Sequence, residues 1–136
     1  MAEKLEMINR LALLNRLRAE MNRAERYGFF VSLVLLDLQD FTSRETNPSW
    51  KSLVRVIKCV RRDLRRVDQV VVYHPYGVAV VLPHTPVGAA EIVAERLREE
   101  LEYTFGYRIR YTITCFPGGG GNPLELLQAS ESSLSL

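Results

Sequence analysis

Apolar residues recur at intervals of three or four positions in several stretches of the chain, the spacing of one buried face of an α-helix. The first such stretch covers residues 4–27, with arginines and glutamates on its other face, and it ends near Gly28. A second stretch covers residues 53–66 and ends in a run of arginines. Both stretches predict amphipathic helices that pack one face onto the rest of the protein.

Two further helices are indicated by their starting residues. Thr85 and Pro86 suit the cap and the first position of a helix, and an apolar stripe follows them. Near the C-terminus, Asn122, Pro123 and Glu125 supply the cap, the first-turn proline and the third-position glutamate that are typical of a helix start.

Four stretches have the pattern of β-strands. Residues 29–38 are rich in strand-forming residues with hardly a polar break, which predicts a central strand buried on both faces. Residues 68–73 and 78–82 form the two arms of a hairpin. Residues 107–115 alternate, so that one set of side chains faces a helix layer. The other set should meet solvent: Arg108, Arg110, Thr112 and Thr114.

The order of these elements along the chain predicts the fold class. It reads α-βαββαβ-α, and its inner six elements match an α+β, ferredoxin-like βαββαβ sandwich with helices packed on an antiparallel central sheet. At 136 residues the chain is long enough to bury a substantial core without a disulfide or metal. We expect residues 1–136 to form a single domain.

Charge, apolar runs and cysteine content limit the partners and the compartment that we expect for this protein. Eighteen basic and 16 acidic residues leave a net charge of only +2, which gives no reason to expect a nucleic-acid partner. The N-terminus lacks the apolar core of a signal peptide, and no apolar run is long enough for membrane insertion. Cys59 and Cys115 fall within apolar patterns as free thiols, which indicates a reducing compartment. We therefore expect a cytoplasmic protein.

Asp37 is the first candidate for chemistry, because it ends the predicted central strand. A carboxylate at a strand end can hold a divalent cation with oxygen ligands, but a magnesium site needs more than one such group. The next carboxylate is Asp40 in the following loop, and the hairpin offers none. The alternative is a strand-terminal aspartate that caps the loop after it.

The two histidines and a run of glycines give only weak indications of a catalytic or phosphate-binding site. His74 and His84 have no nucleophile or carboxylate at a spacing typical of a catalytic triad, and His74 reads as a solvated turn residue. The four glycines at 118–121 precede the last helix, as in a phosphate cradle. No Lys and Ser/Thr pair follows them, so a pliable connector is the favoured interpretation.

The densest charge cluster, "RRDLRRVD" at residues 61–68, has two interpretations. Arginines at the exposed end of a helix are commonly solvated, and they complement the negative end of the helix dipole. Arg65 and Asp68, however, lie three positions apart where the helix gives way to the hairpin. There the guanidinium could make a bidentate hydrogen bond to a guanine edge or a phosphate, while the carboxylate accepts hydrogen bonds from guanine N–H groups.

Taken in order, several segments resemble a GGDEF domain, the diguanylate cyclase module of bacterial signalling. "RAERYGFFVSLVLLDLQDF" is similar to the end of the family's first helix and its first strand. "YHPYGVAVVLPHT" resembles the signature hairpin, while "YTITCFP" and "LLQASESSL" resemble a later strand and the last helix. The resemblance covers nearly the whole chain and implies the family's nucleotide cyclase palm-like fold.

The resemblance also implies that catalysis has been lost. The five signature residues are replaced by His74, Pro75, Tyr76, Gly77 and Val78, which offer no carboxylate, while Pro75 and Gly77 suit an ordinary type I turn. Asp37 matches one metal ligand of the family. We interpret it as a vestigial metal ligand, because Gln39 occupies the position of the family's second Asp. We expect no metal, no cofactor and no cyclase activity.

One functional feature of the family is retained. Arg65-Arg66-Val67-Asp68 matches the Arg-x-x-Asp site that binds cyclic di-GMP, and it stands five residues before the position of the signature. The resemblance therefore implies a regulatory domain that acts as a cyclic di-GMP receptor, or as a protein-interaction or homodimerisation module without a nucleotide. A third alternative is residual GTP binding or weak cyclase activity.

Overall fold

The computed structural model describes residues 2–38, 50–74 and 77–134. Helices and strands follow one another in the predicted α-βαββαβ-α order. Their bounds are α1 (Ala2–Tyr27), β1 (Val31–Asp37), α3 (Trp50–Arg62), β2 (Gln69–His74), β3 (Gly77–Pro83), α4 (Val87–Phe105), β4 (Arg110–Phe116) and α5 (Pro123–Leu134).

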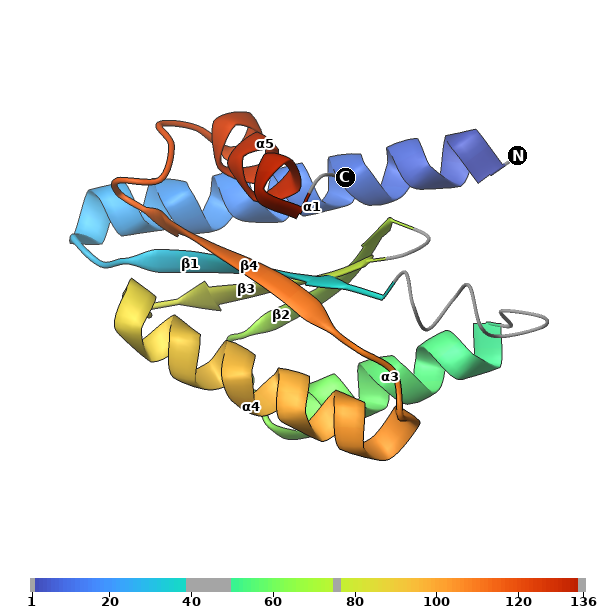
Figure 1. Cartoon of the computed structure of the whole chain (residues 1–136). Coiled ribbons are helices and arrows are strands. Elements are labelled where there is room, and N and C mark those ends of the chain that lie inside the picture. Colours follow the sequence, from blue (N-terminus) through green and yellow to red (C-terminus); the bar gives the residue numbers. More distant parts are fainter. Residues whose placement is uncertain (1, 39–49, 75–76, 135–136) are drawn as a thin grey trace.

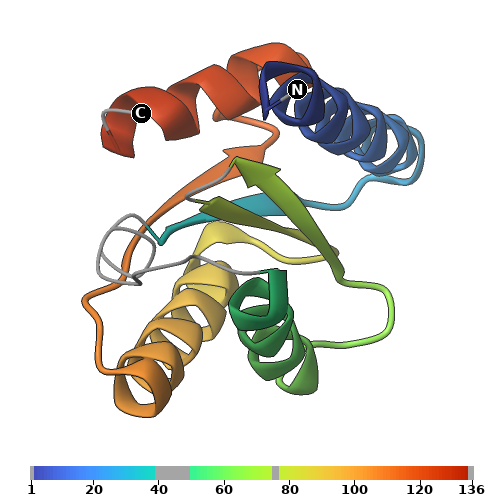
Figure 2. The ribbon, with the colours of Figure 1, turned by 90° about the vertical axis from the view of Figure 1, so that its right-hand side faces the viewer.

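The protein is built in three layers. A four-stranded antiparallel sheet with strand order β2-β3-β1-β4 forms the middle layer. Helices α1 and α5 cover one face of the sheet, and α3 and α4 cover the other (Figures 1 and 2). This arrangement confirms the predicted α+β sandwich class.

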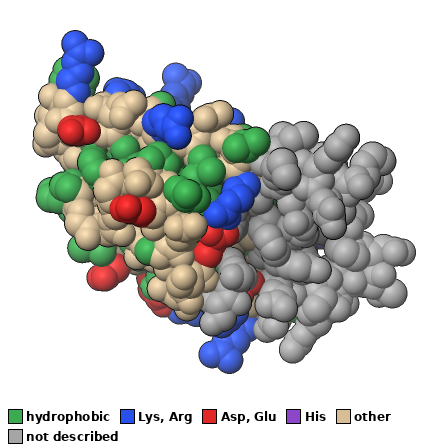
Figure 3. Space-filling model, turned by 90° about the horizontal axis from the view of Figure 1, so that it is seen from above, with side chains coloured by type: hydrophobic (Ala, Val, Ile, Leu, Met, Phe, Trp, Pro, Cys, Tyr) green, Lys and Arg blue, Asp and Glu red, His purple; other side chains and the backbone are tan. Residues whose placement is uncertain are grey.

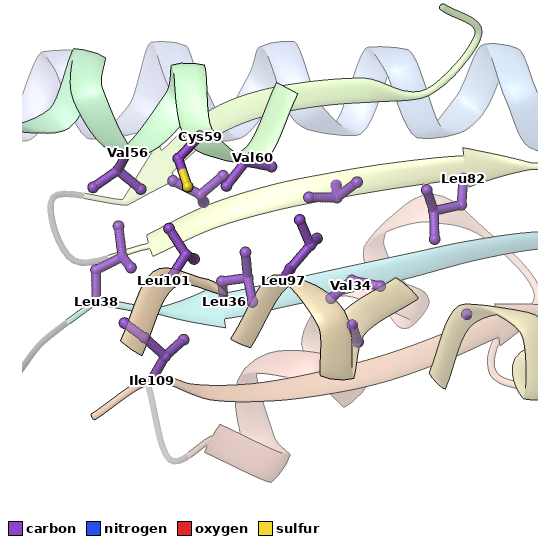
Figure 4. Packing of buried hydrophobic residues seen from close by; sticks show 14 residues of the cluster. Val34, Leu36, Leu38, Val56, Cys59, Val60, Leu82, Leu97, Leu101 and Ile109 are labelled. Carbon is purple, nitrogen blue, oxygen red and sulfur yellow. The ribbon is translucent and has the colours of Figure 1, made fainter. Parts of the chain in front are cut away.

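Strand β1 is central and buried on both faces, as its apolar sequence predicts. Its side chains alternate between two cores, because successive residues of a strand point to opposite faces. Val34 and Leu36 join the cluster under α3 and α4 (Figure 4), whereas Leu33 and Leu35 join the cluster under α1 and α5. All of them are excluded from solvent, so β1 ties the two halves of the core together.

Strand β4 departs from the prediction on its polar face. The strand begins at Arg110, and its two threonines contact α5 instead of solvent. The Thr114 hydroxyl lies 2.9 Å from the Ser130 hydroxyl, and the Thr112 hydroxyl donates to the Ser130 carbonyl. Polar residues on one face of a strand therefore mark a helix contact here, because their hydroxyls find partners on α5.

Two of the predicted helix boundaries are confirmed. Gly28 ends α1 with a positive φ of 74°, and its N–H donates to the carbonyl of Ala24. At the start of α5, the Asn122 side chain accepts from the backbone N–H of Glu125 at 2.9 Å. The Glu125 carboxylate in turn accepts from the N–H of Gly121, which completes a reciprocal cap.

The predicted cap of α4 is wrong. Pro86 occupies the capping position and makes no side-chain hydrogen bond to the helix. The Thr85 hydroxyl instead donates to the carbonyl of Pro83 and is buried. This hydroxyl belongs to a different site, described below.

Two glycines of the run after β4 are packed closely, which the interpretation as a pliable connector did not predict. A Cβ on Gly119 would lie 2.7 Å from the Cys115 carbonyl oxygen, and one on Gly120 would lie 2.9 Å from the Leu126 backbone nitrogen. Both distances are shorter than real side chains tolerate. The glycines allow the chain to turn directly from β4 into α5.

Seen from the side of α1 and α5, the surface mixes small hydrophobic areas with separate charged side chains (Figure 3). Of the helices in the described ranges, none combines the length with the apolar sequence that crossing a bilayer would require. Cys59 is buried, as predicted, and Cys115 is partly buried; both are free thiols.

Candidate functional site

Arg65 and Asp68 are joined in a compact turn between α3 and β2. The Arg65 Nη2 donates to Asp68 Oδ1 at 2.8 Å, and its Nε lies 3.2 Å from Oδ2. The backbone N–H of Arg65 also donates to Oδ2, at 2.8 Å. The two candidate residues thus lie together within one turn, but as a bidentate pair with each other, which the sequence did not predict.

The same guanidinium links the turn to the end of β3. Arg65 Nη2 donates to the Pro83 carbonyl and to the Thr85 hydroxyl, both at 2.8 Å. Because three acceptors surround a single nitrogen with two hydrogens, these contacts share its donor capacity. They fix the position of the guanidinium relative to the sheet.

The two members of the pair differ in exposure. The Asp68 side chain is 3% exposed, whereas that of Arg65 is 52% exposed. Hydrogen bonding to Asp68 raises the pKa of Arg65 above its ordinary value, so the guanidinium stays charged. In the described part of the structure, Arg65 Nη1 has no hydrogen-bond partner, which leaves a fixed, charged donor at the surface.

Arg61 supports the turn from the helix side. Its Nη1 donates to the Asp68 carbonyl at 2.5 Å, and its Nη2 donates to the carbonyl of Arg65. Helix α3 ends at Arg62, four residues before the predicted Arg66, and the Arg61 bonds hold the turn that follows it. The turn is thus held by two arginines and a buried carboxylate.

The second candidate region lies at the other end of β3, where the hairpin begins. Asp37 ends β1 and is opposite Gly77 on one side and Arg110 on the other. Its Oδ2 accepts from Arg110 Nη2 at 2.6 Å, and its side chain is only 3% exposed. A guanidinium therefore occupies the side of Asp37 that faces β4.

A magnesium pair would need more ligands than the described residues at this strand end supply. A cation site needs several oxygen ligands, and the carboxylate of Asp37 is instead neutralised by Arg110. Within the described ranges, no group of three or more His, Cys, Asp or Glu side chains could hold a metal ion. Gln39, Asp40, Pro75 and Tyr76 lie outside the described residues.

The rest of the hairpin is part of the sheet. His74 ends β2, and its backbone pairs with Gly77 after an irregularity in the register. Val78 is fully buried in the core below α3 and α4. His84, the other histidine, has a positive φ of 54° and stacks on Phe29 with ring centroids 3.8 Å apart. Val78 and His84 therefore have packing roles in the structure.

Sequence reasoning missed four partners at these sites. Arg110 is exposed, as predicted, but it also pairs with Asp37, because the antiparallel register places the two side chains on the same face. The alternation of β4 and its pairing with β1 could have suggested this contact. Arg61, Pro83 and Thr85 carried no comparable signal, since their contacts with the Arg65 turn depend on tertiary packing.

Comparison with known proteins reveals the fold but no close relative. No family model and no curated protein matches the sequence. The active GGEEF domain of a diguanylate cyclase from Vibrio cholerae superposes with a TM-score of 0.79 at 18% identity, covering 93% of this chain and 87% of that one. This chain has the fold of a GGDEF domain.

Two other structures with the GGDEF fold are complexes, one with a nucleotide and one with a protein. The GGDEF domain of DgcB from Caulobacter crescentus, in complex with c-di-GMP, matches with a TM-score of 0.76 at 16% identity, over 93% of this chain and 82% of that one. The diguanylate cyclase SiaD from Pseudomonas aeruginosa, in complex with its activator SiaC, matches with a TM-score of 0.67 at 26% identity, over 90% of this chain and 55% of that one.

Proposed function

We propose that this chain is a regulatory GGDEF-fold domain that does not synthesise cyclic di-GMP. The observation that carries the proposal is the ion pair between Asp37 and Arg110. Phosphoryl transfer in such a domain depends on metal ions that neutralise phosphate charge, and a carboxylate held by a guanidinium is a poor ligand for them. The sequence adds Gln39 and the carboxylate-free residues at positions 74–78.

We further propose that the regulatory ligand is cyclic di-GMP, bound at Arg65. The half-exposed guanidinium is charged, is held in place by Asp68, Pro83 and Thr85, and retains donor capacity toward solvent. Such a group suits the phosphate or the guanine acceptor edge of the dinucleotide. The DgcB domain, which shares the fold, was solved with c-di-GMP.

In this proposal the two residues of the motif have different roles. Asp68 is buried, and both of its oxygens accept from Arg65. It therefore positions the arginine, and it could accept from a guanine only if the pair opened. Arg65 is the residue that meets the ligand.

The closed Arg65–Asp68 pair also favours a second candidate function. If the pair does not open for a nucleotide, the domain serves as a protein-interaction or dimerisation module. SiaD, a cyclase of the same fold, was solved with its activator protein SiaC. Both candidates are regulatory, and they differ in whether a nucleotide binds.

Isothermal titration calorimetry with cyclic di-GMP distinguishes the two candidates. The receptor role predicts saturable binding heat that is lost in Arg65→Ala. In Arg65→Lys the affinity should be reduced, because lysine keeps the positive charge but not the bidentate hydrogen-bonding geometry of the guanidinium. Arg66→Ala, in the exposed neighbour, is the matched control and should bind as the wild type does. Circular dichroism verifies that each variant is folded.

Absence of heat at high micromolar ligand would exclude the receptor role and leave the interaction module. Heat that persists in folded Arg65→Ala would place the nucleotide elsewhere on the domain.

A further inference from the structure

Strand β4 lies at an edge of the sheet. Its residues pair with β1 along one side, and no strand within the described ranges pairs with the other side. In Figure 1, β4 crosses in front of the other strands, with its outer edge toward the viewer. An edge strand presents a row of N–H and C=O groups that can pair with another chain.

This edge lacks the usual protection against such pairing. Proteins commonly block exposed edges with proline, lysine or a β-bulge. The sequence of β4, "RYTITCF", has no proline or lysine, and its register with β1 runs without a shift. Its single charged residue, Arg110, is at one end and pairs with Asp37.

A groove of about 840 Å³ runs beside this edge, between α4 and β4. Its apolar lining includes Val87 and Ile92 of α4 and Ile113 of β4. Ile92 is 64% exposed and Val87 is 49% exposed, so both could bury more surface in a complex. The Tyr111 hydroxyl donates to Glu95 Oε2 at 2.9 Å, which links the strand to the helix across the groove.

The outer rim of the groove is acidic. Glu91, Glu95 and Glu99 line it from one side of α4, and Arg96 is the single cation in the lining. Arg98, outside the lining, pairs with Glu95 and lies 3.9 Å from Glu99, so it offsets part of the negative charge of both carboxylates, while Glu91 is in neither of these ion pairs. Hydrogen bonding to Arg98 lowers the pKa of Glu95, so this carboxylate remains ionised.

We propose that the edge of β4 and this groove together bind an extended basic segment of a partner protein, which adds a fifth strand to the sheet. Lysine or arginine at every second position of the partner segment would match both the apolar lining and the acidic rim of the groove. The methylene stems would cover Ile92 and Ile113, and the charged ends would reach the glutamates of α4.

The charge pattern favours such a partner over a second copy of this chain. Antiparallel pairing of β4 with β4 of another copy would bring two α4 helices together on the same side of a continuous sheet. The acidic rims would then face each other and repel. A basic strand meets no such repulsion.

This inference deepens the interaction role proposed above by naming the surface and the chemistry of the partner. Its test uses the isotope-labelled full chain and a synthetic peptide of alternating lysine and valine, as long as β4. Titration followed by NMR should shift and protect the amides of β4, with saturation below about 1 mM. A peptide of alternating glutamate and valine is the control and should not bind.

Two variants test the groove itself. Glu91→Lys with Glu99→Lys reverses the rim charge, and Ile92→Ser removes the exposed apolar contact; each should weaken the lysine–valine peptide at least about fivefold. Leu11→Ser, an exposed leucine on α1, is the matched control and should leave affinity unchanged.

Three outcomes would overturn the proposal: no saturation, saturation without changes at β4, or a homodimer in solution that the groove variants dissociate. None of them bears on cyclic di-GMP, because the Arg65 turn lies outside this groove. A failure here is therefore distinguishable from a failure of the receptor role.

Discussion

Asp37 and Arg110 face each other across β1 and β4, and their side chains meet at 2.6 Å. The aspartate is almost fully buried while the arginine is half exposed, so the arginine shields a carboxylate at the end of the central strand. This position is the one that the resemblance to cyclases assigns to a metal ligand. The pair gives the buried Asp37 carboxylate a charged partner within the sheet.

Replacing Arg110 should destabilise the protein, because a buried carboxylate would lose a charged hydrogen-bond partner. We expect Arg110→Ala to lower the free energy of unfolding by about 1–2 kcal/mol in urea titrations. Arg108→Ala, in an exposed arginine just before β4, is the control and should change stability by less than about 0.5 kcal/mol. Equal effects of the two substitutions would show that the pair adds no stability.

The Arg65 turn should also be sensitive to mutation. Arg65→Ala removes the side-chain donors to Asp68, so that among the described residues the buried carboxylate keeps only the backbone N–H at position 65. We expect a loss of about 1–3 kcal/mol in unfolding free energy. Arg66→Ala should cost less than about 0.5 kcal/mol. An unchanged stability in Arg65→Ala would mean that Asp68 does not depend on this arginine.

Glycine substitutions should have opposite effects at two positions. Gly119→Ala places a Cβ 2.7 Å from the Cys115 carbonyl oxygen, so the turn into α5 must shift and the melting temperature should fall. Gly88→Ala lies in α4 with nothing within 4 Å of the new Cβ. It should raise stability by up to about 1 kcal/mol, since alanine favours helix. Similar melting temperatures for both variants would contradict the close packing at Gly119.

The contribution of Tyr111 to stability should depend on alkaline pH. Burial and the hydrogen bond to Glu95 raise the pKa of Tyr111, so folding favours the protonated phenol. This stabilisation is fully present below about pH 10, the pKa of an unfolded tyrosine, and it is lost as the pH rises through the folded pKa.

The comparison of wild type with Tyr111→Phe isolates this effect, because all other groups titrate in both proteins. The difference in unfolding free energy should be constant at neutral pH and shrink above about pH 10. A difference that stays constant or grows with pH would show that the phenol is not stabilised in its protonated form.

The sequence predicts the order and class of the elements because apolar periodicity reflects burial directly. The nearly unbroken apolar run of β1 marks it as the central strand, and the Asn122 cap marks the start of α5. Local chemistry determines such features, so neighbouring residues are sufficient to read them.

Features that depend on tertiary contacts were predicted less well. The polarity of Thr112 and Thr114 predicts that they face solvent, yet α5 supplies partners for their hydroxyls. Thr85 read as a helix cap, but its hydroxyl lies between Pro83 and Arg65. The Asp37–Arg110 pair likewise depends on the register between strands that are far apart in sequence.

Whether the domain makes cyclic di-GMP can be measured in a single assay. The purified chain is incubated with GTP and Mg²⁺, and the nucleotides are separated by chromatography, with an active GGEEF domain as the positive control. We predict that GTP remains and that no cyclic di-GMP forms, in the wild type and in Arg110→Ala alike. Turnover to cyclic di-GMP by the wild type would show that the domain is an active cyclase.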